Sequence, residues 1–418
     1  MIDQNLIRSN PDKVKELIAR KNFKPQIIDN FLDIDNQWRQ IVSELDNNRA
    51  LQKELSAGRK IEDSKILKEK IKKLEEKERE LEKQKNELLQ DIPNLPFEDA
   101  LVGKDEQDNK TIKEVGKKPE FDFQFKDYLE IAEKLDLIDV KKAAEVSGSR
   151  FGYLKNEAVL LEFALIDLAF KTLIKENFSP VIPPVMIKPE VYIGMGRLSE
   201  SQKEERYYLP KDNLYLVGSA EHTLGPLELN EVMAEEELPK RLLGFSSCFR
   251  REAGSYGKDT KGILRVHQFD KVEMFSFTKP QDSETELRFL VSLQEKLISS
   301  LGLPYRVVEI CTGDMGFTDA RQFDIETWIP SQNTYRETNS ASNTTDFQAR
   351  GINARYKPKN GKPQFVHMLN ATAFAIGRII IAIIENYQQK DGSILIPKVL
   401  QNYMGGEKID SNHFLLHK

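Results

Sequence analysis

The stretch that decides the fold runs from Phe249 to Phe275 and reads FRREAGSYGKDTKGILRVHQFDKVEMF. It predicts two strands, over 241–250 and 265–277, on either side of a polar, glycine-rich loop. Guanidinium groups give phosphate bidentate, charge-assisted hydrogen bonds. The stretch therefore indicates a triphosphate or other anion site, with a solvated charged hairpin as the alternative. The basic side chains around the loop are Arg250, Arg251, Lys258, Lys261, Arg265 and Lys271.

Two shorter segments carry further candidate residues. Glu337 and Ser340 place a carboxylate and a hydroxyl three residues apart, which together with phosphate oxygens would suit a magnesium ion. Arg378 interrupts an apolar run that predicts a buried helix over 372–388, so it is either paired in the core or directed at an anion. The chain has no GxxxxGK[ST] loop and no HExxH pair.

The rest of the second half alternates short apolar runs with amphipathic segments. Strands outnumber the helices that could cross between parallel strands, so we expect an α+β domain with a mainly antiparallel sheet flanked by helices. We expect helices over 156–177 and 282–301, an edge strand over 181–185, and strands near 305–311, 323–329 and 364–369.

The first ninety residues are charged and carry two apolar heptad tracks on either side of a turn at 56–60. Such a pattern predicts an antiparallel helical hairpin, whose role from the pattern alone is either dimerisation and spacing or binding of a partner. The first track is Phe31, Ile34, Trp38, Ile41, Leu45, Asn48, Gln52 and Leu55. The second is Leu67, Ile71, Leu74, Glu78, Leu81, Lys85, Leu88 and Ile92.

Two prolines at 93 and 96 end the second helix, and a polar linker follows at 103–109. We therefore expect two domains, an N-terminal helical arm over 1–108 and a larger domain over 109–418.

Composition excludes several classes of protein. The two cysteines form no CxxC pair, which excludes a disulfide framework and fits a reducing cytoplasm. The start of the chain lacks a signal pattern, and the most apolar run late in the chain, 373–384, contains Arg378 and is too short to span a bilayer. We expect a cytoplasmic protein without a membrane partner. A net charge of −5 does not favour nucleic-acid binding, although a local basic stripe would still permit it.

These motifs together resemble class II seryl-tRNA synthetases along nearly the whole chain. The stretch 249–275 is similar to motif 2 of that family, assigned here to about 241–277, and the helical hairpin is a mark of this synthetase within class II. Motif 1 corresponds to about 156–185 and ends at two prolines. Motif 3 corresponds to about 364–388 and contains Gly377 and Arg378.

The resemblance implies ATP-dependent activation of L-serine and transfer of the seryl group to tRNA(Ser), with tRNA(Sec) left open as a second acceptor. It implies Mg²⁺ held by Glu337 and Ser340, and Arg250 and Arg378 as catalytic cations. The ATP-binding residues it implies are Arg250, Arg251, Glu252, Arg265, Phe269, Glu337, Thr338, Asn339, Ser340 and Arg378. The serine-binding residues it implies are Ser219, Ala220, Glu221, Arg250, Glu273 and Thr372.

The resemblance also implies a homodimer in which the arm of one subunit grips the long variable arm of tRNA(Ser) bound at the other. Basic residues spread along the hairpin suit this role: Lys53, Arg59, Lys60, Lys68, Lys72 and Lys73.

The sequence departs from the family at two places. Ser219 replaces the usual threonine and is followed three residues later by His222, for which we expect a packed or surface role rather than ligand contact. Asn370-Ala371-Thr372 replaces a glycine-containing form and keeps the hydroxyl. Two alternatives remain, namely a non-catalytic RNA-binding paralogue and a serine ligase that loads a carrier protein.

Overall fold

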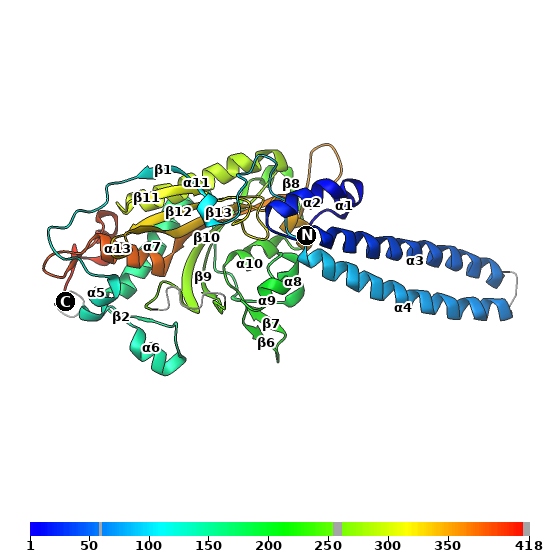
Figure 1. Cartoon of the computed structure of the whole chain (residues 1–418), viewed down its shortest axis with the longest axis horizontal. Helices are drawn as coiled ribbons and strands as arrows, with labels where there is room; N and C mark the ends of the chain where they lie inside the picture. Colours follow the sequence, from blue (N-terminus) through cyan, green and yellow to red (C-terminus); the bar gives the residue numbers. More distant parts are fainter. Residues whose placement is uncertain (58–60, 254–260, 413–418) are drawn as a thin grey trace.

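The computed structural model describes residues 1–57, 61–253 and 261–412. Two long helices, α3 (Gln26–Ala57) and α4 (Ile61–Asp91), run side by side and project from one end of a larger body (Figure 1). Two short helices, α1 (Gln4–Ser9) and α2 (Pro11–Arg20), lie at the base of this arm. The predicted antiparallel helical hairpin is confirmed. Residues 58–60 of its turn and residues 254–260 of the glycine-rich loop lie outside the described residues.

The predicted heptad tracks form the seam of the arm. A core of buried side chains joins the two helices, and it contains Ile41, Leu45, Leu67, Ile71 and Leu81. Two of the polar seam residues are also buried, Asn48 at 9% and Lys85 at 5% exposure. The Lys85 ammonium lies 3.3 Å from the centre of the Trp38 ring, so a cation–π contact takes the place of an apolar pair there.

The larger body is built on one eight-stranded sheet in the order β1-β11-β12-β13-β16-β10-β9-β4. Neighbouring strands are antiparallel except β4, which pairs with β9 in parallel. The strands are β1 (Lys110–Val115), β11 (Tyr305–Glu309), β12 (Arg321–Ile329), β13 (Thr334–Asn343), β16 (His367–Ala375), β10 (Gln268–Thr278), β9 (Lys240–Phe249) and β4 (Ser179–Val181). This is the mainly antiparallel α+β fold that the sequence predicts.

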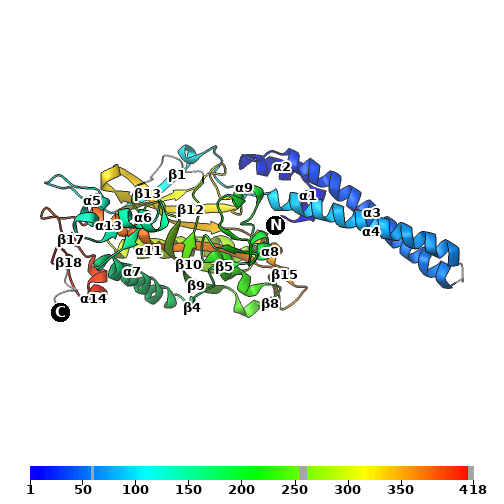
Figure 2. The same cartoon turned by 90° about the horizontal axis from the view of Figure 1, so that it is seen from below.

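Three long helices pack on one face of the sheet, α7 (Glu157–Ile174), α11 (Ser283–Ser300) and α13 (Ile376–Asn386) (Figure 2). Side chains alternate between the faces of a strand, so Val272 and Met274 of β10 join this core while the residues between them face the opposite side. That opposite face carries the polar cavity described below.

Shorter elements connect the strands. The helices include α5 (Tyr128–Lys134), α6 (Val140–Ser147), α8 (Pro189–Gly194), α9 (Glu200–Lys203), α10 (Glu221–Leu224), α12 (Phe347–Ile352) and α14 (Gln401–Met404). The small sheets pair β2 (Ile138–Asp139) with β3 (Tyr153–Leu154), β17 (Ile394–Leu395) with β18 (Lys408–Ile409), β7 (Leu214–Leu216) with β5 (Met186–Ile187) and β6 (Tyr208–Leu209), and β14 (Arg355–Lys357) with β8 (Val232–Ala234) and β15 (Gln364–Phe365).

Two sequence predictions of secondary structure need correction. The helix expected over 372–388 begins only at Ile376, because 367–375 forms the central strand β16. The end of β16 and the start of α13 form one mostly apolar stretch, so periodicity does not mark where the strand ends and the helix begins. The edge strand expected over 181–185 is instead β4, which ends at Val181, before the two prolines that cannot donate to a ladder.

Candidate active site

A polar cavity of about 730 Å³ opens on the face of the sheet opposite α7, and a smaller cavity of about 60 Å³ adjoins it. A volume of several hundred Å³ is typical of a small-molecule site. The two cavities form one continuous site, because they share lining residues. These residues come from the ends of β9, β10, β13 and β16 and from α13. The shared residues are Arg250, Glu252, Arg265, Lys271, Glu337, Thr372 and Arg378.

Two β-bulges shape the floor of this site. Between β12 and β13 the pairing changes from Ile325 opposite Asn339 to Glu326 opposite Glu337, which makes Thr338 an extra residue on β13. A bulge shifts the alternation of side chains by one residue. Glu337 and Ser340, three residues apart, therefore line the same cavity instead of facing opposite sides of the sheet.

The second bulge lies on β16. Val272 is opposite Phe374 and Glu273 is opposite Thr372, so Ala373 is the extra residue. This pairing brings the Thr372 hydroxyl to 3.5 Å from Oε2 of Glu273. The side-chain amide of Asn339 donates to the carbonyls of Thr372 and Ala373 at 3.1 and 2.7 Å and so connects the two bulged strands.

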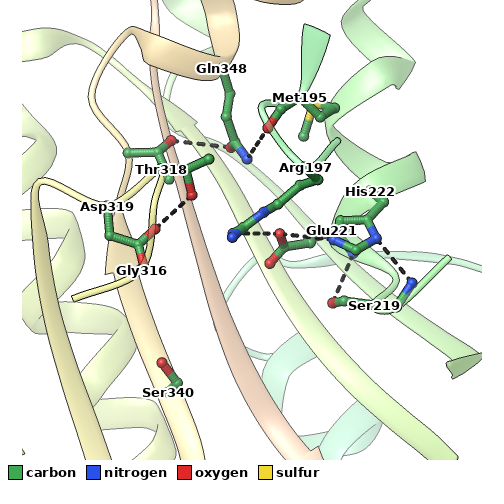
Figure 3. Close-up of polar contacts among 12 residues, drawn as sticks. Met195, Arg197, Ser219, Glu221, His222, Gly316, Thr318, Asp319, Ser340 and Gln348 are labelled. Atoms are coloured by element: carbon green, nitrogen blue, oxygen red, sulfur yellow. Dashed lines mark hydrogen bonds and ion pairs between the residues drawn. The ribbon is translucent and has the colours of Figure 1, made fainter. Parts of the chain in front are cut away.

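One side of the large cavity is formed by the start of α10, where Ser219 and Glu221 are buried. Figure 3 shows Arg197 directed at Glu221, and its Nη2 lies 2.7 Å from Oε1 of that carboxylate. Burial raises the pKa of Glu221, but Arg197, His222 and Lys271 together lower it well below its ordinary value. Glu221 is therefore a fixed anion at neutral pH, suited to an ammonium group.

His222 is buried and packed beside this anion, while the expectation that it makes no contact with a ligand stays a prediction. Its Nδ1 accepts a hydrogen bond of 3.1 Å from the Gly218 backbone, so the neutral ring carries its proton on Nε2, which lies 3.4 Å from Oε1 of Glu221. Burial lowers the pKa of His222 to about 3, which keeps the ring neutral. His222 therefore orients Glu221 without adding charge, although its ring also lines the cavity.

The other side of the site carries the cations. Arg250 lies at the end of β9, where its Nε donates to the Gly218 carbonyl at 3.2 Å and its guanidinium lies 5.2 Å from the centre of the Phe269 ring. Arg378, in the first turn of α13, donates to the Glu337 carbonyl at 2.9 Å and lies 3.2 Å from its carboxylate. Both arginines line both cavities.

Most of the residues that the sequence singled out line the two cavities. They are Ser219, Glu221, Arg250, Glu252, Arg265, Phe269, Glu337, Thr338, Ser340, Thr372 and Arg378. Four others lie elsewhere. Ala220 is fully buried in a neighbouring apolar cluster, Arg251 is exposed with its guanidinium 5.8 Å from the centre of the Tyr207 ring, and Asn339 and Glu273 are fully buried without lining either cavity.

The oxygen donors of Glu337 and Ser340 fit a magnesium ion. Both side chains line the large cavity, and Mg²⁺ in nucleotide sites takes one or two protein oxygens and completes its shell with phosphate oxygens and water. Within the described residues, no group of three His, Cys, Asp or Glu side chains is arranged to hold a metal. A divalent cation at this place would thus depend on the nucleotide.

Sequence reasoning missed Arg197 and the position of Lys271. Arg197 follows Gly196, whose φ of +66° and close approach to Phe347 leave no room for a side chain, so this glycine is needed for packing. No local pattern connects Arg197 with Glu221. Lys271 forms an ion pair with Glu273, and this pairing was open to prediction, because residues two apart on a strand face the same side.

Comparison with known proteins agrees with this architecture. Residues 1–96 match the seryl-tRNA synthetase N-terminal domain, and residues 206–387 match the tRNA synthetase class II core domain (G, H, P, S and T). The chain is 44% identical to the serine–tRNA ligase of Dictyoglomus turgidum over 98% of this chain and 99% of that protein. The serine–tRNA ligase of Thermobifida fusca is 41% identical over 97% of this chain and 98% of its own length.

Solved structures give the same result. The seryl-tRNA synthetase of Pyrococcus horikoshii complexed with ATP superposes with a TM-score of 0.90 at 39% identity and covers 98% of this chain and 99% of its own. The cytoplasmic serine–tRNA ligase of Naegleria fowleri in complex with AMP gives a TM-score of 0.87 at 33% identity, with coverage of 98% and 99%. The chain belongs to the seryl-tRNA synthetase family of class II aminoacyl-tRNA synthetases.

Proposed function

We propose that this protein is a serine–tRNA ligase, which activates L-serine with ATP to seryl-adenylate and then transfers the seryl group to tRNA(Ser). The observation that carries the proposal is the position of Arg250, which lines both cavities. A cation there would contact the serine carboxylate on one side and the α-phosphate of ATP on the other, which are the two groups that react.

The activation step needs no general base, because a carboxylate is already a nucleophile at pH 7. Charge develops on the α-phosphate as the serine carboxylate attacks and pyrophosphate leaves, so catalysis depends on positioning and on fixed cations. Arg250 would stabilise that charge and Arg378 would hold the γ-phosphate. Mg²⁺ at Glu337 and Ser340 would neutralise charge on the phosphate oxygens.

Adenine recognition is proposed for the smaller cavity, where Phe269 offers an aromatic face beside the Arg250 guanidinium. Glu252 is available to read the adenine amino group, and its carboxylate lies 3.6 Å from Nη1 of Arg265, which would contact the phosphates. Thr338 also lines this cavity. Arg251 and Asn339 would act at the nucleotide only through neighbouring residues, since neither side chain lines the cavities.

The serine site is proposed at Ser219, Ala220, Glu221, Arg250, Glu273 and Thr372. The Glu221 carboxylate suits the serine ammonium group, and Glu273 with Thr372 would take the side-chain hydroxyl. A site built to bind a hydroxyl rejects an analogue that lacks it by roughly 10⁴-fold, because its own buried polar groups are then left unpaired.

ATP–pyrophosphate exchange tests the activation step directly. Wild-type protein is assayed with serine, threonine, alanine and cysteine, with Arg250→Ala as the inactive control. Exchange with serine alone is expected. Absence of exchange with all four amino acids, together with tRNA binding, would replace the enzyme by a non-catalytic RNA-binding paralogue.

Transfer is tested with tRNA(Ser) and tRNA(Sec) transcripts and with an acyl carrier protein as competing acceptors. Charging of tRNA(Ser) is expected, and loading of the carrier protein alone would favour the carrier-protein ligase. The arm would hold the tRNA, and the lysines Lys53, Lys68, Lys72 and Lys73 are exposed along it. Arg59 and Lys60 lie outside the described residues. Contacts to RNA phosphates predict a binding constant that falls steeply with salt.

We also propose a homodimer, with the two domains divided near residue 108. The arm extends about 48 Å, from 32 residues in α3, and leads away from the site in its own chain (Figures 1 and 2). A tRNA held by it would therefore reach the site of a second copy. Phe163 on α7 is 63% exposed and Ile182 beside the edge strand β4 is 85% exposed, which gives an apolar surface for that copy.

The dimer is tested by sedimentation equilibrium of the wild type and of Phe163→Asp. A dimeric wild type and a monomeric variant are expected, with pyrophosphate exchange as a check that the variant folds. A wild type that sediments as a monomer at micromolar concentration would contradict the proposal.

No helix within the described ranges has the length and apolar character to cross a membrane.

A further inference from the structure

Lys271 belongs to the basic cluster of the sequence, yet its side chain is directed at the amino-acid side of the site. It is 7% exposed, its Nζ lies 2.6 Å from Oε2 of Glu273, and it donates to the Ser219 hydroxyl at 3.1 Å. Two of its three ammonium protons are therefore used within the serine pocket. This arrangement argues against a main role for Lys271 as a phosphate ligand.

Glu273 uses its two carboxylate oxygens differently. Oε2 receives both the Lys271 ammonium and the Thr372 hydroxyl, whereas Oε1 is buried and has no hydrogen-bond partner within the described part of the chain. Leaving a buried carboxylate oxygen unpaired costs free energy, so a hydroxyl donor at Oε1 would be strongly favoured. Lys271 and Thr372 line the large cavity and both contact Oε2 of Glu273, so these two residues hold the carboxylate in place.

We propose that Lys271 is a positioning and specificity residue for serine, which keeps the Glu273 carboxylate ionised and oriented for the substrate hydroxyl while fixing the Ser219 hydroxyl. The proposal rests on the function proposed above. It assigns to Lys271 an effect on the affinity for serine and on the discrimination against alanine, and no direct effect on ATP.

The charges around Glu273 support this role. Burial is the main influence and raises the pKa of Glu273, as does Glu221 on α10, whereas Lys271 on β10 and Arg250 beyond β9 lower it. Cys248 on β9 stays neutral, because burial raises the pKa of its thiol to about 11. Lys271 is the cation in direct contact, so without it Glu273 would be protonated at pH 7 and would lose its charge-assisted hydrogen bond to the substrate.

The test compares Lys271→Met, which keeps the aliphatic stem, with Lys271→Arg, which keeps the charge. Serine-dependent pyrophosphate exchange is measured from pH 6.5 to 9 in the full-length chain. For Lys271→Met we expect the serine KM at pH 7 to be at least 30-fold higher than in the wild type. As the pH rises above 7, the serine KM of this variant should fall by up to tenfold per pH unit. The ATP KM should stay within twofold of wild type. Lys271→Arg should restore most of the affinity, and the serine-to-alanine preference should fall only in the methionine variant.

A second pair of variants keeps the result interpretable if Lys271→Met folds poorly. Lys271→Met combined with Glu273→Gln leaves no unpaired buried charge at the pair. It should bind serine as weakly as Lys271→Met does at pH 7 and should show no recovery at high pH. Lys279→Met, outside the site, is the matched control and should resemble wild type.

Either of two results would overturn the proposal: a serine KM raised by the same factor at every pH in Lys271→Met, or an equal rise in the ATP KM. The first result would leave Lys271 a structural role only, and the second would make it a phosphate ligand. A wild-type protein that shows no exchange with serine would instead refute the proposed function, so the two failures are distinguishable.

Discussion

Nη2 of Arg197 lies 2.7 Å from Oε1 of Glu221, and the two side chains are only 15% and 6% exposed. A buried ion pair at the edge of a cavity fixes both the charge and the direction of the carboxylate. Arg197 is held in turn by its loop, because the Gln348 amide donates to the Met195 carbonyl at 3.1 Å (Figure 3).

We predict that Arg197→Met lowers kcat/KM for serine about 100-fold, since removing one partner of a buried charge pair costs roughly 2–5 kcal/mol. Glu221 would then be a less stable anion for the serine ammonium. The ATP KM should change little. Pyrophosphate exchange measures both constants, and Arg197→Lys, which keeps the charge, should retain much of the activity. Unchanged serine kinetics in the methionine variant would show that Glu221 does not bind the substrate.

The lowered pKa of His222 leads to a prediction of how the free energy of unfolding depends on pH. Its pKa is lowered to about 3 in the folded chain, against about 6.5 in the unfolded chain, so the unfolded state binds more protons between these values. His222 therefore makes the free energy of unfolding fall as the pH drops from 6.5, by up to roughly 1.4 kcal/mol per pH unit. Urea unfolding at pH 7, 6 and 5 measures this slope.

The matched variant for His222 is His222→Asn, which keeps a hydrogen-bond acceptor near the Gly218 backbone and does not titrate. Its unfolding free energy should be lower than that of the wild type at pH 7 and should decline less steeply toward pH 5. Equal slopes in the two proteins would mean that another group causes the loss of stability in acid.

The hydrogen bonds of Asn339 lead to a prediction about the free energy of unfolding. Asn339→Ala removes the donors to the Thr372 and Ala373 carbonyls, but the Gln294 amide still donates to the first of these at 2.9 Å. One buried carbonyl is then left unpaired, which costs about 2 kcal/mol. Urea unfolding should show this loss. Combining Asn339→Ala with Gln294→Leu should cost more than the sum of the two single changes, and strict additivity would contradict the bridging role.

Lys21 couples the base of the arm to the active site. Its Nζ is buried and donates to the carbonyls of Gly316, Phe317 and Asp319 at 2.7, 3.1 and 2.9 Å, and two of these residues line the large cavity. Lys21→Met leaves buried carbonyls unpaired, so we expect unfolding to cost about 3 kcal/mol less and the serine KM to rise.

The exposed Lys24 provides the control for Lys21, and Lys24→Met should change the unfolding free energy by less than about 0.5 kcal/mol. If Lys21→Met lowers stability but leaves the serine KM unchanged, the contact is a structural clamp and does not connect the arm with the site.

The sequence predicted the parts of the fold whose signals are local. Heptad spacing determined the hairpin of α3 and α4, because each helix buries one seam on the other, and the strands predicted over 241–250 and 265–277 correspond to β9 and β10. It did not separate β16 from α13, since the end of the strand and the buried helix that follows it read as one mostly apolar stretch. Most of the site residues that the family resemblance supplied line the two cavities.

Only the tertiary structure decided how those residues meet. The bulges at Thr338 and Ala373 reverse the side-chain alternation and bring Ser340 beside Glu337 and Thr372 opposite Glu273, which no spacing along a regular strand predicts. Arg197 reaches Glu221 only because its loop packs against α12. Sequence periodicity records which face of an element is buried, whereas the pairing of distant charges depends on register and on close packing between elements far apart in the chain.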